Sequence, residues 1–250
     1  MKLTITHRLK LSVGTPARAV LHLLLTPSAT AQQRVERWSV ETAGIADAAI
    51  FRDGFGNRAH LVSQTRLEGP IEIVAAGVVE TTDKAGVLGR SEYDPPAAMF
   101  RRPLEGVDFE ALATGLDMRG GRIAMLHELM DRLAEAGGMV QEQDGQSQSQ
   151  GTMAPETLAE MFVAAARSLN VPSRVARGYV LDEGDARFHS WAEAWDEGLG
   201  WIGFDPSLNV CPSDFHVRLA SGLDAVTSAA VRSVPAGEAE ASVEIVAEDG

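Results

Sequence analysis

The chain carries two aromatic-rich runs, Phe188-His-Ser-Trp-Ala-Glu-Ala-Trp195 and Gly198-Leu-Gly-Trp-Ile-Gly-Phe-Asp-Pro206. The segment that joins them, Asp196-Glu-Gly-Leu-Gly200, is rich in glycine and acidic residues and predicts a tight reversal. The two runs are therefore typical of a β-hairpin or a short meander, in which Asp205 lies beside His189. A carboxylate that holds an imidazole in one tautomer forms the base and the orienting group of a nucleophilic triad. The nucleophile has to be sought elsewhere in the chain.

Several segments resemble the bacterial transglutaminase-like family, whose core has a papain-like Cys-His-Asp arrangement. They are residues 158–179, the run around His189, and residues 201–206 and 216–224, while Phe51-Arg-Asp-Gly-Phe-Gly-Asn57 is similar, more loosely, to the β-rich region that precedes this core. The resemblance implies an α+β chain with an N-terminal antiparallel β domain over residues 1–100. A papain-like transglutaminase core, with helices packed on an antiparallel sheet, is expected over residues 101–250.

The nucleophile of that family is missing at its expected position. By the resemblance, the cysteine opens a helix twelve residues before the position of Arg167, and Pro155 stands there. A shift of one or two residues gives Met153, Ala154 or Glu156, none of which is a usable nucleophile. Proline suits the first position of a helix, whereas a thiolate would gain there from unpaired N–H groups and the helix dipole. The sequence predicts a retained helix start without thiol chemistry.

Four other side chains are possible replacements for the thiol. Cys211, the single cysteine, follows Asp205 in a turn-like segment, which favours a structural role. A lone cysteine with histidine and aspartate elsewhere is nevertheless a protease signature in general. Ser147, Ser149 and Thr152 lie in the polar loop before the helix and would need a geometry that is new to this fold.

Other residues are assigned to the neighbourhood of the predicted catalytic residues His189 and Asp205. Tyr179 and Trp191 are the predicted substrate-binding residues, with simple core packing as the alternative for both. A buried structural pair is the alternative for His189 and Asp205, because removing either would leave the other unsatisfied. His216 is interpreted as structural. No calcium-binding loop or cluster at metal-ligand spacing is present in the sequence, so we expect no metal and no cofactor.

The periodicity of apolar residues changes near residue 100. Before it, Leu3, Ile5, His7, Leu9, Leu11 and Val13 occupy every second position, which predicts a strand. After it, apolar residues recur at helical spacing at Ile123, Leu126, Met130 and Leu133, and again over residues 158–169. Residues 174–181, 188–195 and 201–205 predict three adjacent strands, residues 241–248 a last strand, and residues 137–151 a polar linker.

Composition limits the partners and the location. The chain has 250 residues, 45% of them hydrophobic, and a formal net charge of −13. This charge argues against nucleic acid or an anionic membrane as a partner. The N-terminus lacks the continuous apolar core of a signal peptide, and the longest apolar stretch, residues 19–25, is too short to cross a bilayer. A single cysteine fits a reducing compartment, so we expect a cytoplasmic protein.

These observations are interpreted as a degenerate, catalytically impaired transglutaminase-like protein that binds a peptide, an amide or a protein partner. The alternative is an active amide hydrolase (a peptidase) or acyl-transferase with a non-standard nucleophile, in which His189 is the base and Asp205 its orienting group. An assembly or scaffold subunit is a third possibility.

Overall fold

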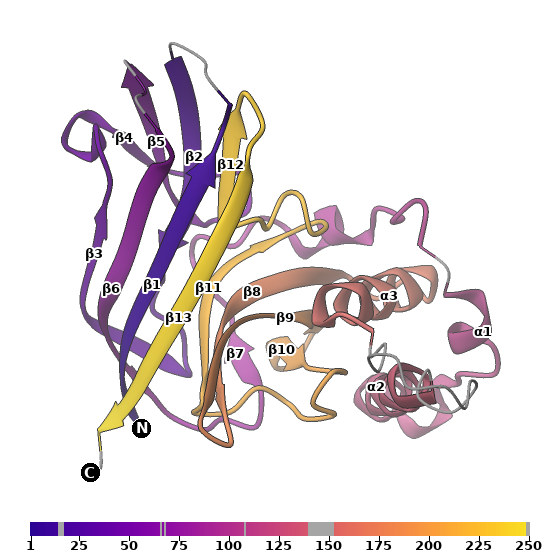
Figure 1. Cartoon of the computed structure of the whole chain (residues 1–250). Coiled ribbons are helices and arrows are strands. Elements are labelled where there is room, and N and C mark those ends of the chain that lie inside the picture. The colour runs from indigo at the N-terminus through magenta and orange to yellow at the C-terminus, as the bar shows by residue number, and fades with distance from the viewer. Residues whose placement is uncertain (15–17, 66, 68, 108, 140–152, 249–250) are drawn as a thin grey trace, which may run out of the picture.

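The computed structural model describes residues 1–14, 18–65, 67, 69–107, 109–139 and 153–248. It consists of three antiparallel sheets and a few helices. Figure 1 shows two of the sheets rising together at one end of the molecule and a curved third sheet, with helices against it, at the other. The predicted α+β class holds in this coarse sense, although the sheets dominate.

The two sheets at the N-terminal end have the strand orders β13-β1-β6-β3 and β12-β2-β5-β4. Alternate residues of β1 from Leu3 to Leu11 are buried, as the predicted alternation requires. These side chains share one apolar core with Leu21 and Leu23 of β2. The strands are β1 (Lys2–Ser12), β2 (Arg18–Thr26), β3 (Gln33–Glu41), β4 (Ala49–Arg52), β5 (Arg58–Thr65), β6 (Ile71–Thr81), β12 (Val231–Val234) and β13 (Glu238–Glu248).

The third sheet has the strand order β11-β8-β9-β10-β7. Its strands are β7 (Val87–Gly89), β8 (Ser173–Asp182), β9 (Asp185–Asp196), β10 (Gly200–Phe204) and β11 (His216–Gly222). The three strands predicted between residues 174 and 205 are confirmed as β8, β9 and β10. The α-helices are α1 (Glu110–Ala113), α2 (Arg122–Met139) and α3 (Pro155–Ser168), and the short 3-10 helices are η1 (Ile45–Asp47), η2 (Ala97–Arg101) and η3 (Met118–Gly120).

Helix α3 covers one face of the third sheet. Its apolar stripe, which includes Leu158 and Phe162, packs with Val175 of β8, Ala192 of β9 and Phe204 of β10. Burial of each large side chain in this core stabilises the fold by about 1.5–3 kcal/mol. Because side chains alternate along a strand, the neighbours of Ala192 on β9 point to the opposite face. His189, three residues before Ala192 on the same strand, points to that opposite face.

Strands from before and after residue 100, the predicted domain boundary, pair with each other in these sheets. Strand β7, from the first hundred residues, pairs with β10 of the third sheet. The predicted last strand is present as β13, and it pairs with β1 from Lys2, opposite Glu248, to Ser12, opposite Glu238. The two ends of the described chain therefore lie side by side (Figure 1).

Helix α2 extends into the predicted linker. Gly137 and Gly138 belong to its last turn, and the linker residues from 140 to 151 lie outside the described residues. None of the helices that the structure describes is both long enough and apolar enough to cross a membrane.

Candidate functional site

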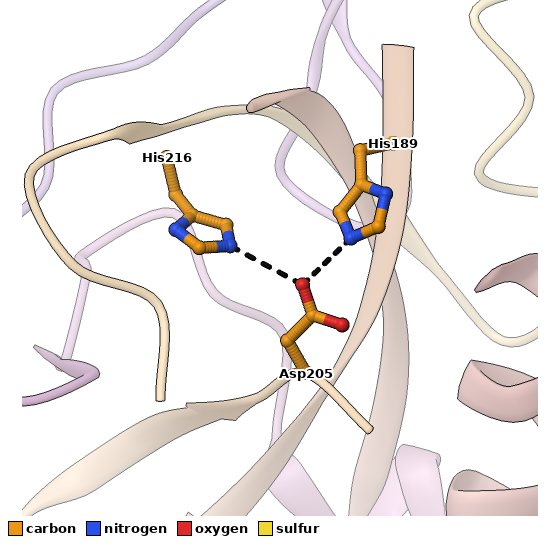
Figure 2. Close-up of side chains that lie close together, drawn as sticks. All are labelled: His189, Asp205 and His216. Carbon is orange, nitrogen blue, oxygen red and sulfur yellow. Dashed lines mark hydrogen bonds and ion pairs between the residues drawn. The ribbon is translucent and has the colours of Figure 1, made fainter. Parts of the chain in front are cut away.

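The two aromatic-rich runs bring His189 and Asp205 into direct contact. His189 lies on β9, and Asp205 directly follows β10, the next strand of the hairpin. The Nε2 atom of His189 is 2.6 Å from Oδ2 of Asp205 (Figure 2). Both side chains are fully buried. The hairpin inferred from the sequence is thus sufficient to place the imidazole on the carboxylate.

A second histidine completes the cluster. His216, the first residue of β11, has its Nε2 atom 3.2 Å from the same oxygen of Asp205 (Figure 2). Its Nδ1 atom accepts a hydrogen bond of 3.3 Å from the backbone N–H of Ser213, which places the ring proton on Nε2. The sequence analysis treats His216 as structural and does not bring it to the pair.

The register of β8 explains why the two histidines meet. His189 is paired with Gly178 and His216 with Val180, so the two imidazoles flank positions of β8 that are two residues apart and share one face. Because β11 follows β10 by a long connection, the spacing of residues along the chain gives no signal of this pairing.

Asp205 is held as a carboxylate. Its other oxygen, Oδ1, accepts hydrogen bonds from Ser207 Oγ at 2.7 Å, from the backbone N–H of Ser207 at 3.0 Å and from that of Leu208 at 3.3 Å. Burial raises the pKa of the Asp205 carboxyl, but the hydrogen bonds and charges of His189 and His216 outweigh this effect and hold the pKa below its ordinary value. The Asp205 carboxyl group is therefore ionised in the folded protein at neutral pH.

Two imidazoles and a carboxylate are also a donor set that binds transition metals. The ligand atoms of His189, Asp205 and His216 lie within 4.8 Å of one another. The separation of 2.6 Å between His189 Nε2 and Asp205 Oδ2 is, however, that of a charge-assisted hydrogen bond. Two tetrahedral ligands at about 2.1 Å from a metal would lie further apart. We therefore describe the group as a hydrogen-bonded His–Asp–His cluster.

The second ring nitrogen of His189, Nδ1, is the atom that a general base would use. When Nε2 donates to Asp205, Nδ1 carries the lone pair that would serve a general base. This atom is buried without a hydrogen-bond partner among the described residues. Figure 2 shows it on the side of the ring turned away from Asp205. The base and its orienting group are in place, and none of the described residues offers His189 Nδ1 a proton to accept.

Pro155 is the first residue of α3, as the sequence predicts. Ala154 precedes it as the N-cap, without a side-chain cap, and Glu156 follows in the first turn. The Glu156 carboxylate ion-pairs with the guanidinium of Arg177 on β8. Arg177 is paired across the sheet with Ser190, the residue after His189. The ion pair thus holds the start of α3 against β8, the strand that pairs with β9. Neither Pro155 nor Glu156 is a usable nucleophile.

Of the four predicted replacements for the thiol, Cys211 is the one that lies in the described part of the chain. Burial, with a contribution from Asp83, raises the pKa of the Cys211 thiol, which disfavours the reactive thiolate. Its Cβ atom packs against the backbone at Gly86. The predicted alternatives Ser147, Ser149 and Thr152 lie outside the described residues.

Ser207 is a hydroxyl that sequence reasoning missed. Its Oγ atom is 3.3 Å from His189 Nε2 and donates to Asp205 Oδ1 at 2.7 Å. Asp-Pro-Ser is a turn-forming sequence, so the hydroxyl returns to its own aspartate. It approaches the nitrogen that already shares a proton with Asp205, and the basic nitrogen is on the other side of the ring.

The two predicted substrate-binding residues have almost no exposed surface. Trp191 is 1% exposed, and its ring stacks on that of His189 with centroids 6.3 Å apart. Tyr179 is fully buried and hydrogen-bonds His7 of β1 at 3.1 Å, within the core that joins the third sheet to the N-terminal sheets. A role in ligand binding stays a prediction for Trp191, whereas the contacts of Tyr179 are those of the packing alternative.

Two family models match the chain. Residues 3–80 match the bacterial transglutaminase-like N-terminal region, and residues 147–206 match the transglutaminase-like superfamily. The chain belongs to the transglutaminase-like superfamily. The second match ends just after Asp205 and contains His189 and Pro155, so the residues that build this site lie within the transglutaminase-like core. A comparison with the curated proteins finds no match.

A solved structure shows the same fold. The crystal structure of a candidate cysteine protease from Cytophaga hutchinsonii has a TM-score of 0.72 and 20% identity, and the alignment covers 100% of this transglutaminase-like chain and 91% of that chain. The periplasmic domain of TgpA from Pseudomonas aeruginosa, bound to ethylmercury, has a TM-score of 0.36 and 13% identity over 82% of this chain and 90% of that one. The first likeness shows the fold, and the second is too low to support an argument.

Proposed function

We propose that this transglutaminase-like protein binds a peptide or an amide-bearing partner without turning it over. The observation that carries the proposal is the first turn of α3, which begins at Pro155, the residue that the resemblance to the family places at the position of the cysteine. Proline has no group that can attack an amide carbonyl. The remaining His189 and Asp205 can accept and orient a proton, but they supply no covalent intermediate.

The burial of the His–Asp–His cluster supports this proposal. His189 is 2% exposed and His216 is 5% exposed, while Asp205 has no exposed surface. A catalytic base has to come within hydrogen-bonding reach of the group that it deprotonates. In the described part of the chain, the cluster acts as a polar element of the core, with most of its hydrogen bonds made internally.

A hydrolase or acyl-transferase with Ser207 as nucleophile is the second candidate, because its hydroxyl is 3.3 Å from His189 Nε2. In a working triad, the acid and the nucleophile contact different nitrogens of the imidazole. Here both contact Nε2, so activation of Ser207 would require the proton to leave the 2.6 Å hydrogen bond to Asp205. This geometry favours the non-catalytic function.

Acylation by an activated ester tests the two candidates. The native chain and its Ser207→Ala and His189→Ala variants are incubated with p-nitrophenyl acetate, and the acylated protein is followed by mass spectrometry. We expect no stable acylation of the native chain at Ser207. Acylation that disappears in both variants would refute the non-catalytic function and establish the second candidate.

Restoring the thiol tests whether the scaffold still suits nucleophile chemistry. We expect Pro155→Cys, in a Cys211→Ala background, to react with iodoacetamide with a thiol pKa below the ordinary value, because the N-terminus of a helix favours a thiolate. Pro155→Ala in the same background is the unreactive control. A thiol with an ordinary pKa would show that the start of α3 no longer suits nucleophile chemistry.

The cytoplasm is the proposed location, supported by the single cysteine. Peptides or proteins are the proposed partners, and the net charge of −13 argues against nucleic acid. Fractionation of a bacterial host that expresses the natural full-length gene checks the location, and recovery outside the cytoplasm would refute it.

A further inference from the structure

A polar cavity of about 800 Å³ lies between the N-terminal sheets and the third sheet. Residues of β3, of β4 and β5, and of the segment after β7 line it, together with Arg174, Trp201 and Arg218 of the third sheet. The His–Asp–His cluster does not contribute to its lining. The volume is in the range of sites that take small organic ligands, and it is far larger than a single inorganic anion requires.

The cavity gathers arginine residues on a chain whose net charge is −13. Arg37, Arg52, Arg58 and Arg90 line it, and none of these four forms an ion pair with a carboxylate in the described part of the chain. Arg52 and Arg58 are direct register partners on β4 and β5. Like charges placed directly opposite each other destabilise a sheet, so an anion between them would relieve the repulsion.

The acidic residues of the lining do not neutralise these arginines. Glu36 contacts Lys2 and Arg34, which are outside the lining. Asp94 ion-pairs with Arg174 at 2.9 Å, and Glu92 hydrogen-bonds the Tyr93 hydroxyl. The four arginines, all of them exposed, therefore leave a local excess of positive charge on an acidic protein.

Three sheet edges border the same cavity. Strands β3, β4 and β7 are each the last strand of their sheet, and each contributes residues to the lining. The outer edge of such a strand has backbone N–H and C=O groups that are not paired within its sheet, and an extended peptide can pair with them. A peptide can pair with these backbone groups along its length, whereas a compact anion cannot. The strand edges therefore favour a peptide as the ligand of this cavity.

The walls are fixed before any ligand arrives. The side chain of Asn57, in the turn between β4 and β5, donates to the Ser221 carbonyl at 2.7 Å and accepts from the Ser221 N–H at 2.9 Å. The Arg52 guanidinium lies 3.5 Å from the centre of the Tyr93 ring. Fixed walls reduce the entropy that a ligand would lose in ordering them.

We propose that this cavity binds an extended acidic peptide segment, whose carboxylates pair with these four arginines, which have no ion pair in the described part of the chain, and whose backbone pairs with an exposed strand edge. Arginine suits the task because its planar fork binds a carboxylate through two parallel hydrogen bonds. The proposal rests on residues other than those of the proposed function, so either one can fail alone.

Titration calorimetry with synthetic peptides tests the proposal. The full chain is titrated with blocked tri-glutamate, with blocked tri-glutamine and with inorganic phosphate, and the first titration is repeated at high salt. We expect tri-glutamate to bind at least about tenfold more tightly than tri-glutamine and phosphate, with an affinity that falls as salt rises. Equal affinity for the two peptides, or no binding of either, overturns the proposal. Phosphate binding as tight as that of tri-glutamate would indicate a site for inorganic anions and overturns it too.

Variants locate the binding. Arg37→Gln combined with Arg58→Gln should weaken tri-glutamate binding by about tenfold or more, whereas Arg18→Gln, on the exposed side of β2, is the matched control. His189→Ala should leave the affinity unchanged, which separates this site from that of the proposed function. Unchanged affinity in the Arg37/Arg58 variant, or an equal loss in Arg18→Gln, overturns the proposal. Binding should also protect the amides of β3 or β4 from hydrogen exchange.

Discussion

His7 of β1 and Tyr179 of β8 are hydrogen-bonded at 3.1 Å in the core that joins the N-terminal sheets to the third sheet. The His7 ring also stacks on Phe188, with ring centroids 5.3 Å apart. Burial lowers the pKa of His7 to about 4, because the charged imidazolium loses its hydration there. The interface between the two ends of the molecule therefore contains a histidine that is neutral in the folded state.

The free energy of unfolding should fall as pH decreases from about 6.5 to about 4. In this window the unfolded chain binds a proton at His7 and the folded chain does not, so acid favours unfolding. A pKa difference of this size corresponds to about 3 kcal/mol, fully lost once the pH is below the folded-state pKa. Urea unfolding followed at several pH values measures it.

His7→Asn is the variant for this measurement, because it keeps a polar partner for Tyr179 and removes the titration. Burial also lowers the pKa values of His22 and His60, so their contributions remain in both proteins and cancel in the difference. We expect a flatter pH dependence for the variant. Parallel curves for the native chain and the variant would rule out His7 as the source.

Loss of the carboxylate at Asp205 should destabilise the fold strongly. Asp205→Ala leaves the Nε2 protons of His189 and His216 buried without an acceptor, at an expected cost of about 3–5 kcal/mol in the free energy of unfolding. Ser207→Ala removes one hydrogen bond to the same carboxylate and should cost about 1 kcal/mol. Chemical unfolding at neutral pH compares the two. A loss in Asp205→Ala as small as the one expected for Ser207→Ala would mean that the His–Asp–His cluster contributes little to the free energy of unfolding.

The hairpin that unites His189 with Asp205 is local in sequence, which is why it could be predicted from alternation and a glycine-rich turn. The same applies to β1 and to α3, whose periodicities decide their buried faces. The sequence leaves two roles open for Tyr179, substrate binding and core packing. Its partner His7 is 172 residues away, and no local pattern encodes that contact.

The features that sequence reasoning missed all depend on long-range pairing. His216 joins the cluster only through the register of β11 on β8. The C-terminal strand β13 returns to pair with β1, at the other end of the chain. Arg37 and Arg90 line one cavity, although Arg37 lies on β3 and Arg90 follows β7 of the third sheet. Side chains of this kind are exposed and carry no periodic signal, so their grouping follows from tertiary structure alone.

Glu193 should be among the most sensitive residues of the third sheet. Its fully buried carboxylate binds Arg174 Nε at 2.5 Å and Arg218 Nε at 2.6 Å. Glu193→Gln keeps the volume but leaves the two guanidinium groups repelling each other, so we expect a loss of about 3–5 kcal/mol. Glu128→Gln, which breaks an exposed pair with Arg132 on α2, should change stability by less than about 0.5 kcal/mol. Equal effects in thermal unfolding would contradict the central role of Glu193.

Gly56 is required where the turn between β4 and β5 meets the segment after β7. Its backbone has a φ of 84°, and a Cβ atom would collide with the backbone carbonyl of Tyr93. Gly56→Ala therefore combines an unfavourable backbone conformation with a clash against a rigid neighbour, at an expected cost of about 1–3 kcal/mol. Gly54→Ala in the same turn is the matched control, because no atom outside its neighbours lies within 4 Å of the added Cβ and it should cost less than about 0.5 kcal/mol. Thermal unfolding of both variants measures the difference in stability. Because Gly56 fixes one wall of the arginine-lined cavity, Gly56→Ala should also bind tri-glutamate more weakly. If both alanine variants unfold at the same temperature, the close approach of the turn to Tyr93 is not a constraint on the fold.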